Sequence, residues 1–157
     1  QNCDPKNTVI YLGISWDEAN RLDRNRARNP GWSIEAPLCQ PSYLDKPQQL
    51  EILKLTGIVP PRLYALGFPH NNCGGFCIKA GQAQFALLLK TFPDRYRFHE
   101  QKELEIQKHV GSKMTILRDR RGGKTRPLSL RVFRERLESG GDCPKYDWGG
   151  CGCAIDD

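Results

Sequence analysis

The chain has 157 residues, which is enough for one ordinary domain with its own hydrophobic core but not comfortably enough for two. Apolar residues make up 38% of it and charged residues 27%, so the composition lies well away from that of disordered proteins. The formal net charge is +6, and no run of 18 apolar residues is present, so no membrane-spanning helix is expected.

The first segments predict an α/β arrangement. Residues Thr8–Ile14 form a nearly continuous apolar run, which indicates a buried strand. Ser15 and Glu18 have the spacing of a capping box, so a helix is expected from there to about Arg28, before Pro30. A strand that leads directly into a capped helix is the unit of α/β folds, in which polar sites gather at the carboxyl end of the strand.

The middle of the chain predicts helices separated by loops. Residues Asn29–Lys46 are rich in Pro, Gly and Ser and indicate an ordered loop, with Trp32 and Ile34 packing inward. Residues 67–77 show neither helical nor strand periodicity. Helices are expected over Lys46–Thr56, capped by Asp45, and over Arg62–Leu66, Lys79–Thr91 and Asp94–Val110.

The pattern changes after Gly111. Met114–Leu117 predicts a brief strand, and Gly122-Gly123 within a basic run indicates a hairpin. Ser129 is expected to cap a last amphipathic helix. The apolar face of that helix is formed by Leu130, Phe133 and Leu137. From Ser139 onward the chain is rich in glycine and aperiodic, so something other than packing must hold this tail.

Together these elements predict a helix-rich α/β fold that forms a single unit over residues 1–157. Residues 1–60 would supply the strand–helix part of an α/β domain. Residues 61–157 would form a helical extension that contains a basic hairpin and most of the cysteines. A metal bound by those cysteines would stabilise this extension. No internal repeat and no linker long enough to separate domains is present.

Seven cysteines are too many to be incidental. An odd count, without a signal peptide or an Asn-x-Ser/Thr sequon, disfavours a fully paired disulfide framework. We therefore expect a cytoplasmic protein that binds a metal through thiolates.

Two close cysteine pairs define the candidate metal site, Cys73 with Cys77 and Cys151 with Cys153. Glycines beside them allow the backbone to turn tightly enough for two sulfurs to face one ion. Four thiolates fit either zinc or an iron–sulfur cluster. Such a metal would bind the tail to the Cys73 loop, and its binding free energy would stabilise the folded state.

Other residues leave alternatives open. Cys39 could replace one of the tail cysteines in a cluster. The competing interpretation is that the cysteines are buried free thiols, which pack as small apolar side chains, and this is what we expect of Cys3 and Cys143. No catalytic residue is identified by spacing. His70, just before Cys73, is a candidate ligand or acid–base group, although a loop histidine more often has a structural role.

A basic segment extends from Arg118 to Arg136, with eight positive and two negative charges, and accounts for the whole net charge. Guanidinium groups bind phosphate or sulfate in a bidentate manner, and glycine amides can approach such anions closely. The segment therefore predicts either an anion site or a solvated surface. The candidate anion ligands are Arg118, Arg120, Arg121, Lys124 and Arg126.

Five short segments of the sequence resemble those of one protein family. They are Tyr11-Leu-Gly-Ile-Ser-Trp16, Glu35-Ala-Pro-Leu-Cys39, Gly67-Phe-Pro-His-Asn-Asn-Cys-Gly-Gly-Phe-Cys77, Arg118-Asp-Arg-Arg-Gly-Gly123 and Asp147-Trp-Gly-Gly-Cys-Gly-Cys153. They are similar to the C-terminal half of phosphoadenosine phosphosulfate reductase-like proteins, often found in bacteria and phages. These belong to the PP-loop, or adenine nucleotide α-hydrolase-like, superfamily.

The resemblance implies the later part of a Rossmann-like PP-loop domain with a helical, cysteine-bearing extension. Family members bind ATP or a sulfonucleotide, and relatives reduce sulfate or insert sulfur into nucleic acid; some carry an iron–sulfur cluster. The family's nucleotide-binding loop, Ser-Gly-Gly-x-Asp-Ser, is absent from these residues, so nucleotide binding is expected only of a full-length protein that has it.

Two functions are consistent with the sequence. The first is the C-terminal part of a nucleotide-dependent sulfonucleotide reductase-like or sulfur-transfer enzyme, with a cysteine-bound metal and a nucleotide or other anionic substrate. The second is a non-catalytic, metal-stapled module that uses the basic segment to bind nucleic acid. Few aromatic residues lie among those arginines to stack on bases, which weighs against the second.

Overall fold

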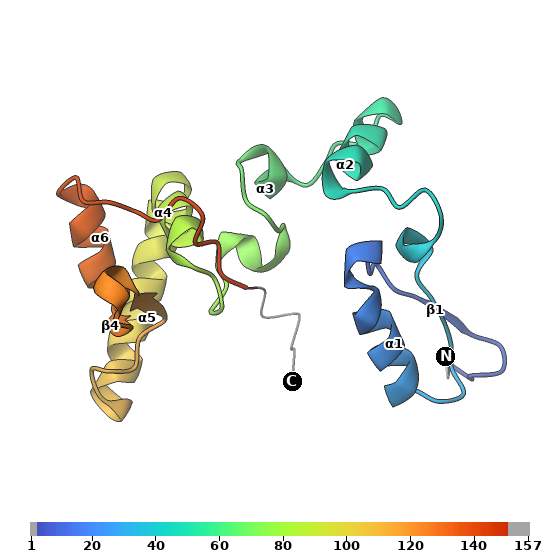
Figure 1. Ribbon diagram of the computed structural model, residues 1–157, viewed down its shortest axis with the longest axis horizontal. Coiled ribbons are helices and arrows are strands. Elements are labelled where there is room, and N and C mark those ends of the chain that lie inside the picture. The colour runs from blue at the N-terminus through green and yellow to red at the C-terminus, as the bar shows by residue number, and fades with distance from the viewer. Residues whose placement is uncertain (1–2, 151–157) are drawn as a thin grey trace. The chain divides into compact units, whose positions relative to one another are not determined.

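The computed structural model describes residues 3–150, and its internal contacts divide the chain after Pro60 into two compact units (Figure 1). Helices predominate among the described residues, with two small sheets, so the expected mixed α/β class is confirmed. Within this part of the chain, no helix is both long and apolar enough to cross a membrane.

The first unit is built around a strand–helix–strand motif. Its strands pair in parallel, with Ile10 opposite Ile34, and α1 connects them. Within residues 3–150 no third strand joins this pair. The elements are β1 (Val9–Tyr11), η1 (Trp16–Glu18), α1 (Ala19–Arg28), β2 (Ser33–Glu35), η2 (Pro37–Cys39) and α2 (Lys46–Leu55).

The start of α1 differs from the expected capping box. The Ser15 side chain makes no capping hydrogen bond, and a turn of 3-10 helix precedes α1. The Glu18 carboxylate instead accepts a hydrogen bond from Arg21, at 2.6 Å, so the prediction of a Ser15–Glu18 capping box is wrong. By contrast, the Asp45 cap of α2 is confirmed, with Gln48 completing a capping box.

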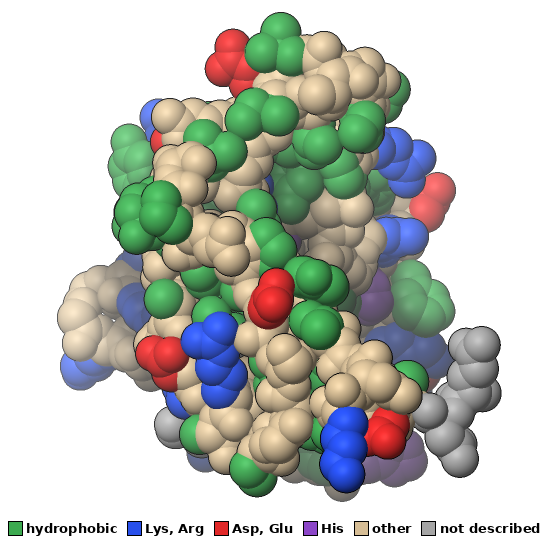
Figure 2. Space-filling model, turned by 90° about the vertical axis from the view of Figure 1, so that its right-hand side faces the viewer, with side chains coloured by type: hydrophobic (Ala, Val, Ile, Leu, Met, Phe, Trp, Pro, Cys, Tyr) green, Lys and Arg blue, Asp and Glu red, His purple; other side chains and the backbone are tan. Residues whose placement is uncertain are grey.

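The core of the first unit is small. Ile34 on β2, expected in a loop, packs inward as predicted, and the partly buried Trp32 packs against the same cluster. Leu55 and Val59, by contrast, are 80% and 88% exposed. Hydrophobic side chains are also visible on the surface drawn in Figure 2. The buried cluster consists of Ile14, Leu22, Ile34 and Ala36.

The second unit contains four α-helices, two short 3-10 helices and a hairpin among its described residues. Helix α4 begins at Gln82, three residues later than expected, and the first hairpin strand begins at Leu117 rather than Met114. The hairpin strands are antiparallel, with Leu117 opposite Leu128. The elements are α3 (Arg62–Ala65), η3 (Asn72–Gly75), α4 (Gln82–Thr91), α5 (Pro93–Val110), β3 (Leu117–Asp119), η4 (Arg121–Gly123), β4 (Arg126–Leu128) and α6 (Leu130–Glu138).

Helices α4, α5 and α6 pack on one another around a shared core (Figure 1). Tyr96 at its centre is fully buried, and its hydroxyl donates to the carbonyl oxygen of Leu130 at 2.7 Å. Burial strongly raises the pKa of Tyr96, so this hydroxyl remains protonated. The other fully buried large side chains are Phe85, Leu88, Leu130 and Phe133.

A buried carboxylate fastens the hairpin and α6 to α5. Glu103 is 4% exposed, and its two oxygens accept the amides of Ile116 at 2.8 Å and Leu130 at 2.7 Å. Burial raises the pKa of Glu103, and the two amides act in the opposite direction. Ser129 caps α6 as predicted, its hydroxyl accepting the Val132 amide at 3.3 Å.

Candidate metal centre

The tail segment, residues 147–150, is held by backbone pairing with the chain that leads into α4. The amide of Gly81 donates to the carbonyl of Trp148 at 2.9 Å, and the amide of Gly150 donates to the carbonyl of Lys79 at 2.8 Å. In Figure 1 the red end of the chain runs beside the start of α4. The aperiodic tail is therefore ordered by main-chain hydrogen bonds up to Gly150.

Two glycines allow this close approach. Gly149 has a φ of +71°, and a Cβ atom there would lie 2.5 Å from the carbonyl oxygen of Lys79. A Cβ atom at Gly81 would clash with the backbone of Asp147. Because the obstructing atoms are main chain, a larger side chain at either position requires the tail segment to move.

Asp147 caps α4 from a distant part of the chain. Its Oδ2 accepts the amide of Gln82 at 3.2 Å, and its carbonyl oxygen accepts the amide of Ala83 at 2.8 Å. Its Oδ1 lies 3.8 Å from Nη1 of Arg120. The residue therefore satisfies amides of the first helical turn and links them to the hairpin.

The pairing brings Cys77 to the end of the tail segment. The Cys77 sulfur donates to the carbonyl oxygen of Gly150 at 4.0 Å, and the next residue in the sequence is Cys151. Cys151 and Cys153 lie outside the described residues. Within residues 3–150, no three Cys, His, Asp or Glu side chains are placed to hold a metal ion, so the predicted site depends on that second pair.

The remaining candidates lie in varied surroundings. Cys73 is exposed on the same loop as Cys77, with a φ of +54°. Cys39 belongs to the first unit, where its sulfur donates to the carbonyl of Ile14 at 3.3 Å. Cys143 is half-buried against the core, and burial raises the pKa of its thiol. Cys3, expected to be buried, is exposed.

His70 is exposed and lies outside the two pockets of the second unit described here, one beside Cys73 and the other beside the tail segment. The structure records no hydrogen bond or ion pair that joins His70 to another residue in the described range. Nothing in its surroundings distinguishes it as an acid–base group.

The structure places only two of the five predicted anion ligands in one pocket. Arg118 and Arg120 line a pocket of about 330 Å³ beside the tail segment, together with Lys79. Lys79, which sequence reasoning missed, enters the pocket because its backbone pairs with the tail segment; no local pattern signals this. Arg121, Lys124 and Arg126 do not line it.

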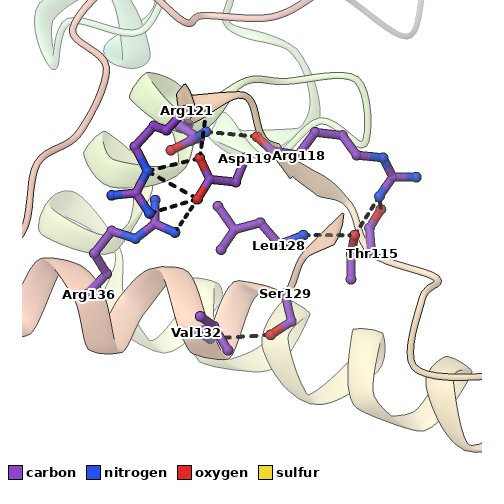
Figure 3. Close-up of polar contacts among 9 residues, drawn as sticks. Thr115, Arg118, Asp119, Arg121, Leu128, Ser129, Val132 and Arg136 are labelled. Atoms are coloured by element: carbon purple, nitrogen blue, oxygen red, sulfur yellow. Dashed lines mark hydrogen bonds and ion pairs between the residues drawn. The ribbon is translucent and has the colours of Figure 1, made fainter. Parts of the chain in front are cut away.

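Much of the basic segment is neutralised by acids. Asp119 lies between two guanidinium groups, 2.7 Å from Nη2 of Arg121 and 2.9 Å from Nη2 of Arg136 (Figure 3). The hydrogen bond from Arg121 is the main reason why the pKa of Asp119 is well below its usual range. Asp119 is one of the two acids already counted in the segment, so its pairing leaves the net charge unchanged but engages two of the guanidinium groups.

A second acid comes from outside the segment. Glu100, on α5, pairs with Arg134 at 2.8 Å and with Arg131 at 3.5 Å. The hydrogen bond from Arg134 lowers the pKa of Glu100. In contrast, Lys124 and Arg126 are exposed, and no ion pair to another residue of the described range is recorded for them.

Comparisons with models of protein families, with curated proteins and with solved structures gave no significant match for this chain.

Proposed function

We propose that this chain is the C-terminal part of a nucleotide-dependent sulfonucleotide reductase-like or sulfur-transfer enzyme whose cysteines hold zinc or an iron–sulfur cluster. The observation that carries the proposal is the contact between the Cys77 sulfur and Gly150, the residue that precedes Cys151. The first cysteine pair therefore lies close to the chain that leads to the second pair.

The first unit supports the enzyme part of the proposal. Two parallel strands joined by a helix are the repeating element of α/β folds, in which parallel sheets are covered on both faces. Here Val9 and Tyr11 of β1 are 43% and 66% exposed. These two side chains lie on the same face of the strand, and we therefore infer that a further layer covers this face in the full-length protein, as in a PP-loop domain.

The proposed roles follow from the chemistry of the side chains. Cys73, Cys77, Cys151 and Cys153 would supply four thiolates, which is a ligand set of structural zinc sites and of iron–sulfur clusters. When bound, zinc would stabilise the fold, and a cluster would also transfer electrons. Lys79, Arg118 and Arg120 would bind the sulfate or phosphate group of a substrate beside this centre.

Metal analysis tests the central claim. Protein purified anaerobically is expected to contain stoichiometric zinc, or iron with labile sulfide and a visible absorption band. Cys77→Ser and Cys151→Ser should abolish metal retention, whereas Cys3→Ser, at an exposed cysteine outside the proposed set, should retain it. Metal-free protein, or equal retention by all three variants, would refute the metal centre.

Nucleotide binding is tested separately on the full-length protein. Isothermal titration with ATP and with a sulfonucleotide is expected to show binding of at least one of them. If neither binds, the enzyme assignment fails, whatever metal the cysteines hold.

The exposed Lys124 and Arg126 favour the alternative, a non-catalytic module that binds nucleic acid. Its affinity would fall steeply with added salt, because neutralised phosphates release their counterions. Substituting both residues with Gln would then weaken binding and reduce that salt dependence. An electrophoretic mobility unchanged by excess RNA or DNA would exclude this function.

A further inference from the structure

A second pocket lies between the Cys73 loop and α5, away from the tail segment. Its volume is about 490 Å³, within the range of sites for small molecules. Among residues 3–150, its lining combines aromatic rings with one guanidinium group and includes no acidic side chain. The lining residues are Cys73, Gly74, Phe76, Arg95, Phe98 and His99.

The aromatic side chains form a preordered wall. The rings of Phe76 and His99 are stacked, with centroids 3.4 Å apart and planes inclined by 10°. Phe98 meets His99 edge to face, at 5.2 Å, and yet is 57% exposed. Burial, and to a lesser extent Arg95, lowers the pKa of His99, so its ring is neutral at pH 7. The exposed ring of Phe98 is available to stack on a planar ligand, and Nζ of Lys102 lies over one of its faces, 5.7 Å from the centroid.

The guanidinium group of Arg95 is held at the pocket by the loop. Its Nη1 donates to the carbonyl of Gly74, and its Cζ lies 5.8 Å from the centre of the Phe92 ring. Cys73 and Gly74 both have left-handed backbone angles, with φ of +54° and +59°, and so turn that carbonyl toward Arg95. No acidic partner of Arg95 is recorded within residues 3–150, and a guanidinium has five N–H donors, so donors remain for an anion.

We propose that this pocket binds a nucleotide, with its base stacked on Phe98 and its phosphate bound by Arg95. Stacking on an aromatic side chain tolerates any base, because every base has a π face, and guanidinium is well matched to phosphate. The site shares Cys73 with the proposed metal centre, and no residue of the basic hairpin is among its lining residues named above. A mononucleotide and a single-stranded nucleic acid share this chemistry.

Titrations with chosen probes test the proposal. The probes are AMP, UMP and inorganic phosphate by calorimetry, and a labelled oligo(dT) by fluorescence anisotropy. Binding of the mononucleotides identifies a nucleotide site, and binding of the oligonucleotide alone identifies a site for single strands; either result supports the proposal. Absence of binding by all three base-containing probes, or inorganic phosphate that binds as tightly as AMP, would overturn it.

Variants locate the site. Phe98→Ala should weaken binding about tenfold or more, and Phe98→Leu, which keeps an apolar side chain but no π face, should weaken it to a similar extent. Tyr146→Ala removes another exposed aromatic residue, outside the pocket, and should leave the affinity unchanged. Equal affinities of the wild type and both Phe98 variants, each shown to be folded by circular dichroism, would refute the site.

Discussion

The sulfur of Cys77 and the carbonyl oxygen of Gly150 lie 4.0 Å apart, although 73 residues separate them along the chain. Main-chain hydrogen bonds between residues 79–83 and the tail segment hold these two distant parts of the chain together. A metal bound by both cysteine pairs would join the same two parts of the chain that these main-chain hydrogen bonds join, and closing so long a loop costs conformational entropy.

Gly149→Ala is expected to destabilise the second unit by about 1–3 kcal/mol, because the residue has a positive φ and a Cβ atom would clash with main-chain atoms. Gly150→Ala is the matched control, since a Cβ atom there meets no atom within 4 Å. Urea denaturation of both variants measures the difference. Equal stabilities would show that the tail segment is not held as described.

Asp147→Ala should reduce stability by about 0.5–2 kcal/mol, the usual cost of losing a helix cap. The Gln82 amide loses its side-chain acceptor, so its hydrogen exchange should accelerate. The Ala83 amide bonds to the backbone of residue 147 and should be less affected. Thermal unfolding and exchange measured by NMR test this. Asp142→Asn, at an exposed aspartate nearby, should change neither measurement.

Asp119→Asn is expected to lower stability at pH 7 by about 1–2 kcal/mol, because it removes the carboxylate that joins Arg121 and Arg136. The folded-state pKa of Asp119 is lower than its ordinary value, so its contribution is present above that value and is lost as the pH falls below it. The variant should therefore lose less stability than the wild type between pH 4 and pH 2. Arg126→Gln, an exposed control, should follow the wild-type curve.

Glu103→Ala should cost about 2–4 kcal/mol, because two amides that are buried or partly buried lose their acceptor. Glu103→Gln keeps one acceptor oxygen and should be milder. The folded-state pKa of Glu103 is raised, so its contribution to stability declines as the pH rises from the ordinary carboxyl range through that pKa. The Gln variant should lack this decline. Asp94→Asn, at an exposed site on the same helix, is the control for denaturation measured across pH.

Local signals predicted several local elements, although not the start of α1, where the expected Ser15–Glu18 capping box does not form. The Asp45 and Ser129 caps, the hairpin around Gly122 and the extent of α5 all follow from residues within a few positions of one another. Strand β2 was missed because only three residues pair, and Ile34 alone among them is buried. Such a segment is too short to show strand periodicity.

Long-range relationships could not be predicted in this way. The tail segment pairs with residues 79–83 through main-chain atoms. Its sequence contains glycines that permit this close pairing, but nothing in it indicates which part of the chain is the partner. The neutralisation of Arg131 and Arg134 depends on Glu100, which lies on another helix. Likewise, the wall of the second pocket combines Phe76 from a loop with Phe98 and His99 from α5.

The cap of α4 has a consequence for the order in which the protein folds during synthesis. Asp147 leaves the ribosome 65 residues after Gln82, the residue whose amide it accepts. Until then the first turn of α4 lacks that cap, although all the residues of the helix have been made. A nascent chain that stops before Asp147 would therefore hold α4 with a frayed amino end. The second unit completes its folding only when the tail segment emerges.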